Sequence, residues 1–317
     1  MDEFDLIRRF FAHPVIRKDT VCGIGDDCAL LDPRRDQVLA ASIDTLVAGV
    51  HFFADVQPEA LGHKALAVSL SDLAAMGAEP AWAFLALTLP DADPFWLESF
   101  SHGLFKLARK FRVELAGGDT TRGSLAISMQ VLGWVPGGRG LLRSAARPGD
   151  DIYLTGSVGD AGLGLKMLQG EMEWRDEAVL ERLLRPLPRV ETGMALRGIA
   201  HACIDVSDGL AADLGHILHA SGLGATIRWQ DLPLSASVRR YIEQTGDWRL
   251  PLYAGDDYEL CFTAPCSHRL QLEQCLPSQE VPWHRIGKIE EQQGLRLIKG
   301  GKMITLQQVG YRHFQND

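Results

Sequence analysis

Hydrophobic residues recur along the chain at two spacings, which separate the predicted helices from the predicted strands. Apolar residues at helical spacing predict a short helix before Pro14 and a long helix from Pro58 to Met76, which Gly77 ends. Asp93 and Pro94 are typical of a helix start, and the segment after them carries the apolar stripe Leu97, Phe100, Leu104, Leu107 and Phe111. We therefore expect this third helix to pack its apolar face against a core.

Segments with apolar residues at period two, or with hardly any polar residues, predict strands. In the first half these are Gln37 to Val47, Ala81 to Leu89, Val113 to Ala116 and Leu125 to Val131. The Ala81 to Leu89 run is almost wholly apolar, as is typical of a strand covered on both faces. In the second half we expect strands at Ile152 to Thr155, Ala202 to Ile204 and Leu260 to Phe262, a glycine-rich turn at Gly156 to Gly164, and a helix that ends at Gly222.

The length of the chain and its clusters of proline and glycine together predict two domains. The chain has 317 residues, more than the ~100 to 200 residues typical of one domain. Proline and glycine cluster at Pro136-Gly137-Gly138 and again at Arg147-Pro148-Gly149-Asp150. We therefore expect a boundary near 140 to 150, with one domain over residues 1–145 and the other over residues 146–317.

Composition and charge exclude some classes of protein. Hydrophobic residues make up 46% and charged residues 23% of the chain, and no apolar run approaches the ~18 residues of a membrane span. A net charge of -9 argues against nucleic-acid binding, although it permits phosphorylated ligands that are held through magnesium. The acidic start has no apolar signal segment, and the six cysteines lack C-x-x-C spacing. Both features indicate a cytoplasmic protein with reduced, structural thiols.

The most distinctive polar stretch is Gly117 to Gly123, with the sequence Gly-Gly-Asp-Thr-Thr-Arg-Gly. Adjacent glycines let backbone N–H groups approach a ligand closely, and a carboxylate, two hydroxyls and a guanidinium follow at once. This combination suits a polyphosphate and its divalent cation, so we expect a ligand-binding loop after the short Val113 to Ala116 strand. The run is also compatible with an ordinary polar turn, because Gly-Gly-Asp is common in turns.

Carboxylates recur at the ends of other predicted elements and on the long helix. They are Asp27, Asp44, Asp72, Asp119 and Asp205. Each alone is compatible with a turn or a helix cap, but a buried cluster of acids is costly without a cation. Because magnesium prefers carboxylates shared with substrate phosphates, the set predicts a metal-phosphate site. The sequence has no P-loop, protein-kinase motif or zinc spacing, and Gly159, Gly162 and Gly164 lack dinucleotide-binding spacing.

Six motifs, in this order along nearly the whole chain, resemble those of the thiamine-monophosphate kinase family. They are Gly23-Ile24-Gly25-Asp26-Asp27, the run from Ser42 to Phe52, Ser71-Asp72-Leu73-Ala74-Ala75-Met76-Gly77, Gly117-Gly118-Asp119-Thr120-Thr121, Asp205-Val206-Ser207-Asp208-Gly209 and Gly255-Asp256-Asp257-Tyr258-Glu259-Leu260. The resemblance implies a two-domain α/β fold like that of aminoimidazole ribonucleotide synthetase, dimerising through the N-terminal sheet. It also implies phosphorylation of thiamine monophosphate to thiamine diphosphate by ATP, with several Mg²⁺ ions, in a homodimer.

The resemblance also implies roles for single residues. The metal ions would be held by Asp27, Ser42, Ile43, Asp44, Asp72, Asp119 and Asp205, with a further ion near Asp208. ATP would contact Gly118, Asp119, Arg143 and Ser207. The thiamine substrate would be bordered by His51, Asp256 and Tyr311. Three positions depart from the family pattern: Asp256 replaces a glutamate, Ile43 replaces a threonine and would use its carbonyl, and His102 stands where an aromatic residue faces the nucleotide.

No residue is expected to act as a general base or nucleophile. The acceptor phosphate is already anionic at pH 7, because its second pKa is ~6. We therefore expect direct in-line transfer without a phosphoenzyme, in which metal ions and Arg143 offset the repulsion between two anions. The sequence leaves three alternatives open: another ATP-dependent synthetase of this fold, of the aminoimidazole ribonucleotide or selenophosphate type, a two-metal phosphatase, or a non-catalytic metal-binding scaffold.

Overall fold

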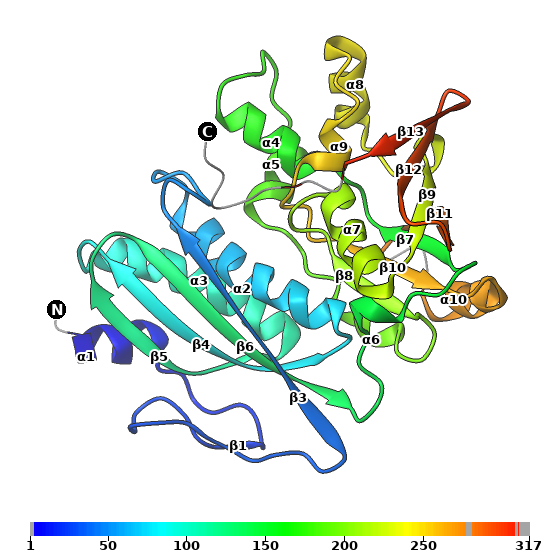
Figure 1. Ribbon diagram of the computed structural model, residues 1–317. Helices are drawn as coiled ribbons and strands as arrows, with labels where there is room; N and C mark the ends of the chain where they lie inside the picture. Colours follow the sequence, from blue (N-terminus) through cyan, green and yellow to red (C-terminus); the bar gives the residue numbers. More distant parts are fainter. Residues whose placement is uncertain (1–2, 277–280, 308–309, 311–317) are drawn as a thin grey trace. The chain divides into compact units, whose positions relative to one another are not determined.

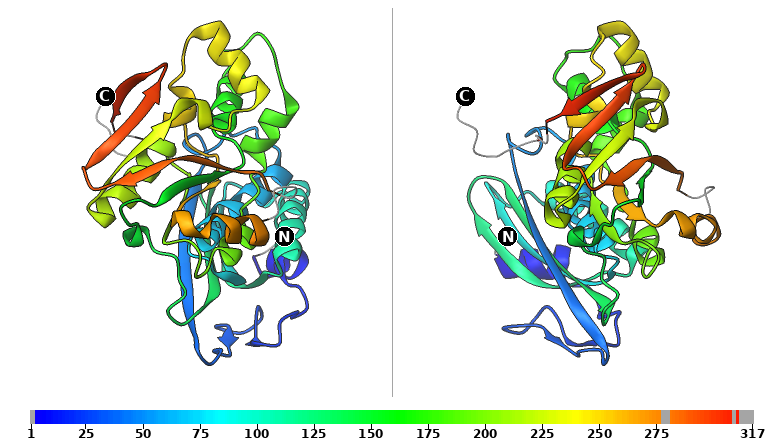
Figure 2. Two further views of the ribbon diagram at one scale, coloured as in Figure 1. Left: turned by 90° about the vertical axis from the view of Figure 1, so that its right-hand side faces the viewer. Right: turned by 45° about the vertical axis from the view of Figure 1, so that its right-hand side comes forward.

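The structure is a computed structural model that describes residues 3–276, 281–307 and 310. The chain divides into two compact units, which Figures 1 and 2 draw in sequence colours. The first unit comprises the described residues up to Leu73 together with Ala78–Gly138. The second comprises Ala74–Gly77 and the described residues from Arg139 onward. Each unit has its own sheet and its own helices, and each is described by itself below.

The first unit is built on a four-stranded sheet in the order β3-β6-β4-β5. Its strands are β3 (Gln37–Val47), β4 (Glu79–Leu89), β5 (Glu114–Arg122) and β6 (Ala126–Pro136). Only β4 and β5 are parallel to each other; the other pairs are antiparallel. Helices α2 (Pro58–Ala75) and α3 (Pro94–Phe111) lie along the same face of this sheet (Figure 1). The shorter elements that precede them are α1 (Glu3–Leu6), a π-helical turn (Ile7–Phe11), β1 (Thr20–Cys22) and β2 (Leu30–Leu31).

Helix α3 forms where its sequence predicts it. The carboxylate of Asp93 accepts a hydrogen bond from the Phe95 N–H at 2.9 Å, and the predicted apolar stripe is buried throughout. The helix packs closely against α2 through two glycines. A Cβ atom on Gly62 would lie 2.0 Å from the Phe100 carbonyl oxygen, and one on Gly103 would lie 1.9 Å from the Glu59 carbonyl oxygen. Only glycine permits this separation of the two backbones.

The two faces of this sheet differ in burial. Leu46, Leu85 and Met129 point towards the helices and are buried. On the other face the segment of β1 and β2 covers only one end, where Trp82 Nε1 donates a hydrogen bond to Thr20 Oγ1 at 2.8 Å. The expectation that the Ala81 to Leu89 strand is covered on both faces is therefore wrong within this unit. Beyond Trp82 no described element covers the second face, and Ala86 is exposed.

The predicted loop at Gly117 to Gly123 is also wrong, because β5 continues as a strand to Arg122. The glycines accommodate an irregular register next to β4, where the pairing shifts between Ala83 and Phe84. Gly118 has φ 152° and pairs with Leu85, whose carbonyl oxygen would lie 1.9 Å from a Cβ atom at this position. Glycine therefore allows the polar run to stay in the sheet as its edge strand.

The second unit is built on a seven-stranded sheet in the order β13-β12-β9-β11-β7-β10-β8. Its strands are β7 (Asp151–Thr155), β8 (Ala202–Asp205), β9 (Gly224–Arg228), β10 (Leu260–Ala264), β11 (Trp283–Glu290), β12 (Gly294–Lys299) and β13 (Lys302–Leu306). Strands β9 and β12 are parallel, and the other pairs are antiparallel. Its helices are α4 (Asp160–Leu168), α5 (Glu177–Leu184), α6 (Val190–Ala195), α7 (Leu210–Ser221), α8 (Ala236–Thr245), α9 (Leu250–Tyr253) and α10 (Arg269–Cys275). Figure 2 shows β12 and β13, the two strands at one edge of this sheet.

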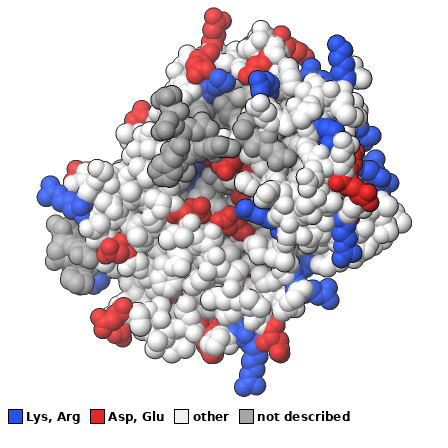
Figure 3. All heavy atoms as spheres, in the orientation of Figure 1, with Lys and Arg blue, Asp and Glu red and all other residues white. Residues whose placement is uncertain are grey.

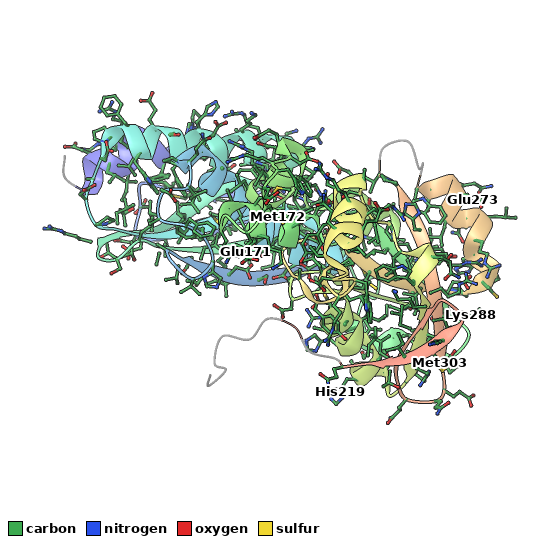
Figure 4. All side chains as sticks on the ribbon, turned by 90° about the horizontal axis from the view of Figure 1, so that it is seen from above. Glu171, Met172, His219, Glu273, Lys288 and Met303 are labelled. Atoms are coloured by element: carbon green, nitrogen blue, oxygen red, sulfur yellow. The ribbon has the colours of Figure 1, made fainter. Side chains whose placement is uncertain are left out.

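Helix α7 supplies much of the core of this unit. Its residues Leu214 and Ile217 are fully buried in one cluster with Ile152 and Ile204 of the sheet. The helix ends at Gly222, in the left-handed conformation at φ 71°, as the sequence predicts. A smaller cluster joins α4, α5 and α8, and Met172, labelled in Figure 4, packs against it.

The predicted glycine-rich turn at Gly156 to Gly164 is only partly correct. Helix α4 begins at Asp160 and therefore includes Gly162 and Gly164. The helix starts early because the buried carboxylate of Asp257 accepts hydrogen bonds from the N–H groups of Gly159, at 2.8 Å, and Ala161, at 3.3 Å. An acid distant in sequence thus caps this helix, which local sequence patterns could not reveal.

The thiols agree only in part with the prediction of structural cysteines, because Cys203 and Cys261 are buried whereas Cys28 and Cys266 are exposed. All six cysteines are free, and burial raises the pKa of the Cys203 and Cys261 thiols. On the face drawn in Figure 3, basic and acidic side chains of the described residues are interspersed. Of the helices in the described part of the chain, none has the length and apolar character needed to cross a bilayer.

Candidate functional site

Three of the predicted metal ligands meet on the helix-covered face of the first unit's sheet. Ser42 and Asp44 are two residues apart on β3, so both side chains point to the same face of the sheet. The Ser42 hydroxyl donates a hydrogen bond to Asp72 Oδ2, which reaches the sheet from α2. Ser69, one turn before Asp72 on α2, contacts the Asp44 carboxylate and also hydrogen-bonds the Met129 carbonyl oxygen, at 3.1 Å.

The electrostatics of this cluster are unfavourable as the side chains stand. Burial, and then the charge of Asp72, raises the pKa of Asp44 to about 6. Asp44 Oδ2 is buried and has no hydrogen-bond partner among the described residues. A buried oxygen without a donor, beside a second carboxylate, is an acceptor for a divalent cation. The donor set consists of two carboxylates and a hydroxyl, so these residues fit Mg²⁺, which prefers oxygen ligands.

Gly118 lies in the same row of the sheet as Asp44. Two other predicted metal ligands, Asp119 and Asp27, do not lie beside Asp44 and Asp72. The row runs from Asp44 through Met129 and Leu85 to Gly118. Asp119 pairs with Ala86, one position beyond the row, and is exposed. Asp27 is also exposed, between β1 and β2. In the described part of the first unit, no hydrogen bond links either residue to Asp44 or Asp72.

The other predicted residues of the first unit lie close to β3 or on α3. The side chain of Ile43 is 64% exposed on the opposite face of β3, which leaves its backbone carbonyl as the group that could bind a cation. His51 lies in the turn after β3, where its Nδ1 accepts a hydrogen bond from the Val47 N–H at 3.0 Å. This bond fixes the neutral tautomer with the proton on Nε2. His102 lies on α3, where its Nδ1 is 3.5 Å from Glu59.

In the second unit the structure brings two predicted motifs side by side. Asp205 ends β8 and is buried, and Ser207 and Asp208 follow in the turn before α7. The Asp256 N–H donates a hydrogen bond to the Ser207 carbonyl oxygen at 2.8 Å, and a second such bond joins the Tyr258 N–H to Val206. Residues predicted to contact metal, ATP and thiamine thus lie on adjacent segments of one unit.

The segment that carries Asp256 has an unusual backbone. Asp256 and Tyr258 have φ values of 67° and 50°, in the left-handed region that is uncommon for residues with a side chain. The Tyr258 hydroxyl donates a hydrogen bond to Asp256 Oδ1 at 3.0 Å and so orients this carboxylate. Arg143 is exposed on a 3-10 turn (Arg143–Ala145) that lies against α7 and β8. Tyr311, also predicted at the substrate, lies outside the described residues.

Comparisons with known proteins show the family to which the chain belongs. The family model described as AIR synthase related protein, N-terminal domain, matches residues 25–135, and the corresponding C-terminal domain matches residues 147–300. Thiamine-monophosphate kinase of Escherichia coli strain K12 is 50% identical over 318 aligned residues, covering 98% of this chain and 98% of that protein. The chain belongs to the thiamine-monophosphate kinase family. This membership confirms the family and the fold predicted from the six motifs.

Solved structures of thiamine-monophosphate kinases are similar along nearly the whole chain. The enzyme of Stenotrophomonas maltophilia K279a has a TM-score of 0.87 at 45% identity and covers 93% of this chain and 96% of its own. A structure described as AaThiL complexed with AMPPCP and TMP has a TM-score of 0.79 at 31% identity, covering 98% and 96%. Hydrogenase maturation protein HypE, at 22% identity and a TM-score of 0.80, shows the shared fold alone.

One residue of this kinase family member that the motifs did not single out is Asp213. It lies in the first turn of α7, is buried, and its Oδ2 accepts hydrogen bonds from the N–H groups of Ser207, Asp208 and Gly209, at 3.0, 3.0 and 3.1 Å. Asp213 therefore holds the shape of the turn that presents Ser207 and Asp208. An acid in the first helical turn that reaches back to preceding N–H groups is a capping signal, which could have identified it in the sequence.

Asp213 also belongs to a group of three residues whose ligand atoms lie close together. Asp208, Asp213 and His216 each place one potential ligand atom within 4.8 Å of the others. Burial, followed by the charges of Asp205 and Asp208, raises the pKa of Asp213 to about 8. Asp213 Oδ2 already accepts three backbone hydrogen bonds. The further ion near Asp208 stays a prediction.

Replacing Asp44 by Asn should change how stability depends on pH in metal-free protein. Folding raises the pKa of Asp44 from 3.8 to about 6. The folded protein therefore binds this proton more tightly than the unfolded protein does. As a consequence, the free energy of unfolding falls as pH rises from 3.8 to about 6. Between pH 3.5 and pH 7 the wild type should lose about 3 kcal/mol relative to Asp44→Asn. Urea unfolding in EDTA measures this difference, with the exposed Asp27→Asn as control. Parallel pH profiles for wild type and Asp44→Asn would contradict the burial of this charge.

Two substitutions of Asp213 should separate its hydrogen bonds from its charge. Asp213→Ala leaves three backbone N–H groups without their acceptor and should lower the free energy of unfolding by about 2 kcal/mol or more. Asp213→Asn keeps an acceptor oxygen for these N–H groups, so it should cost less than about 1 kcal/mol. Urea unfolding at pH 7 provides the measurement. Equal losses in the two variants would show that the turn does not depend on these bonds.

Proposed function

We infer that this protein transfers the γ-phosphoryl group of ATP to thiamine monophosphate and so forms thiamine diphosphate. The observation that carries the inference is membership of the thiamine-monophosphate kinase family over nearly the full length of the chain. It is supported by similarity, across 98% of this chain, to the structure described as AaThiL complexed with AMPPCP and TMP. AMPPCP is an ATP analogue, so that structure contains counterparts of both proposed substrates.

We further propose that Mg²⁺ is the metal and that several ions bind. Support comes from the all-oxygen donor set of Ser42, Asp44 and Asp72 and from the buried Asp44 Oδ2 without a donor. The proposed ligands that complete the set are Asp27, the Ile43 carbonyl, Asp119, Asp205 and Asp208. When bound, Mg²⁺ would offset the negative charge of the phosphates and of these acids.

The chain's own residues then have the task of positioning two phosphorylated ligands. We propose that ATP contacts the Gly118 backbone, Asp119, Arg143 and Ser207. Gly118 suits close approach because it has no side chain, and the Arg143 guanidinium can donate two parallel hydrogen bonds to a phosphate. Asp213 contributes by holding the turn that contains Ser207. No general base is required, because the acceptor phosphate is anionic at pH 7, with a second pKa of ~6.

The proposed thiamine contacts are His51, Asp256 and Tyr311. His51 offers the Nε2–H as a donor because its Nδ1 accepts from Val47. The Asp256 carboxylate is oriented by Tyr258 and is a suitable partner for the cationic thiazolium ring. We propose that residues 1–145 form the domain with the metal and ATP contacts, and that residues 146–317 complete the ATP and substrate contacts.

The inferred reaction is tested by omitting its components one at a time. Thiamine diphosphate should form only when ATP, Mg²⁺ and thiamine monophosphate are all present, as detected by chromatography of the products. Asp72→Asn should lower kcat by at least about 100-fold with little change in stability, because it removes a proposed cation ligand. Asp93→Asn is the matched control, since asparagine also caps a helix.

The alternatives give different products in the same assay. Hydrolysis of a phosphate ester without ATP would indicate a two-metal phosphatase. ATP consumption without thiamine diphosphate would indicate a synthetase with another substrate, and nucleotide binding without turnover would indicate a scaffold. Wild-type activity in Asp72→Asn would contradict the ligand role of Asp72. A phosphoryl group recovered on a side chain would contradict direct transfer.

We propose that the protein is a cytoplasmic homodimer that associates through the uncovered face of the first unit's sheet. That face presents Ile43 at 64% and Leu39 at 46% exposure, as apolar groups suited to burial between two copies. A cytoplasmic location agrees with a requirement for ATP and with six free cysteines.

The proposed dimer predicts that a charge on the uncovered face weakens association. Leu39→Glu should increase the dimer dissociation constant by at least about 10-fold, because a buried unpaired charge is costly. Val38→Glu is the matched control: Val38 is 58% exposed but lies on the opposite face of β3. Light scattering during gel filtration measures the mass of each variant. A monomeric wild type, or equal weakening by the two substitutions, would contradict this interface.

A further inference from the structure

A cavity of about 430 Å³ in the second unit is lined by none of the residues proposed above to contact metal, ATP or thiamine. Its lining comes from the turn after β7, from α5 and the segment before α6, from α8 and the residues before it, and from the start of β11. Three of the lining side chains are arginines, Arg182, Arg189 and Arg239, and His284 is a fourth basic group. None of the described lining residues is acidic.

Two of the arginines are fixed from behind by a buried acid. Glu259 is fully buried and pairs with Arg182 and with Arg189, whose Nε lies 2.7 Å from Glu259 Oε2. Thr155 Oγ1 donates a further hydrogen bond to Glu259 Oε2 at 2.6 Å. Burial by itself would raise the pKa of Glu259, but the hydrogen bond and charge of Arg189, with the charge of Arg182, lower it. Glu259 is therefore ionised and holds two guanidinium groups in fixed positions.

Acids behind the cavity lining offset the charge of its guanidinium groups. Glu259 offsets one of the two guanidinium charges that it holds. The lining hydroxyls of Ser157 and Ser235 both donate to Asp160, a second buried acid behind the wall, Ser235 at 2.5 Å. Arg239 adds a third guanidinium, which donates from Nε to the Leu234 carbonyl oxygen at 3.3 Å. Asp257 is a third buried acid whose charge acts on Arg182, so three acids match the three guanidinium groups before His284 is counted.

We propose that this cavity is a binding site for a small phosphate-class oxyanion. Each guanidinium has five N–H donors in a planar fork, and the pairs with Glu259 use only some of those of Arg182 and Arg189. Donors held in place by a buried carboxylate lose little side-chain entropy when an anion binds. The lining suits a tetrahedral dianion, either free phosphate or the phosphoryl group of a small ester, because guanidinium groups pair with such oxygens in two-point contacts. The volume admits either ligand.

The test is a calorimetric titration of the full-length protein with inorganic phosphate at pH 7.5, at constant ionic strength. EDTA is present, so that metal-dependent binding at the proposed ATP site does not contribute. The wild type should show saturable binding, and Arg239→Gln should weaken it at least tenfold. Arg240→Gln is the matched control, because Arg240 follows on the same helix but does not line the cavity. It should stay within twofold of wild type.

Arg239 is exposed and outside the Glu259 pairs, so its variant should fold normally, which a thermal melt checks. His284→Gln provides an independent second variant on β11 and should weaken binding as well. Arg143→Gln should bind phosphate as wild type does, because Arg143 does not line the cavity. A parallel titration with phenyl phosphate distinguishes the sources: tighter binding of phosphate favours the free anion, and tighter binding of the ester favours a phosphorylated metabolite.

Three results would overturn the proposal. The first is the absence of saturable binding of either ligand to the wild type. The second is equal affinity in Arg239→Gln and Arg240→Gln, with His284→Gln unchanged. The third is a loss of binding in Arg143→Gln alone, which would place the anion at the proposed nucleotide site. Because turnover of thiamine monophosphate is not the readout, these results are independent of the inferred reaction.

Discussion

The repulsion between Asp44 and Asp72 is the constraint on which the first unit's site depends. Strand β3 and helix α2 bring these carboxylates to the same covered face of the sheet, where water cannot fully solvate them. Folding stabilises such a pair only when a proton or a cation neutralises part of the charge. Under the proposed function, which brings two phosphorylated ligands next to each other, a buried pair of this kind would bind a cation more strongly than solvent-exposed acids.

Three buried acids of the second unit differ from Asp44 in the number of hydrogen-bond donors around them. Asp213 accepts three backbone N–H groups, Asp257 accepts two, and Glu259 pairs with two arginines. In these cases donors from the protein satisfy the carboxylate, and its task is to shape a turn, cap a helix or fix guanidinium groups. Asp44 keeps an oxygen without a donor in the described structure. Asp44 thus differs from these three acids in leaving an oxygen available to a ligand.

Most elements of the fold could be predicted from local patterns. Strand β3 spans the predicted Gln37 to Val47, and α3 carries the predicted buried stripe, because periodicity and capping are local properties. The edge strand at Gly117 to Arg122 was not predicted, since its conformation depends on pairing with β4. The early start of α4 was missed for a similar reason, because its cap comes from Asp257, nearly a hundred residues away.

The sequence motifs predicted some residues of the candidate site and missed others. The motifs identified Ser42, Asp44 and Asp72, and the structure brings these three together. They did not reveal Ser69 as a contact of Asp44, because an ordinary helical serine carries no signal of its role. The arginines of the cavity in the second unit were not singled out either. They are far apart in sequence, and only the tertiary fold places them around one cavity.

We propose that a cation displaces the proton that burial favours on Asp44. Calorimetric titration of metal-free protein with Mg²⁺ at pH 6, in two buffers of different ionisation enthalpy, counts the protons released. Since the pKa of Asp44 is about 6, wild type should release about half a proton at this site as Mg²⁺ binds, and Asp44→Asn should release correspondingly less and bind Mg²⁺ more weakly. Identical Mg²⁺ affinity and proton release in the two proteins would show that Asp44 does not bind the cation.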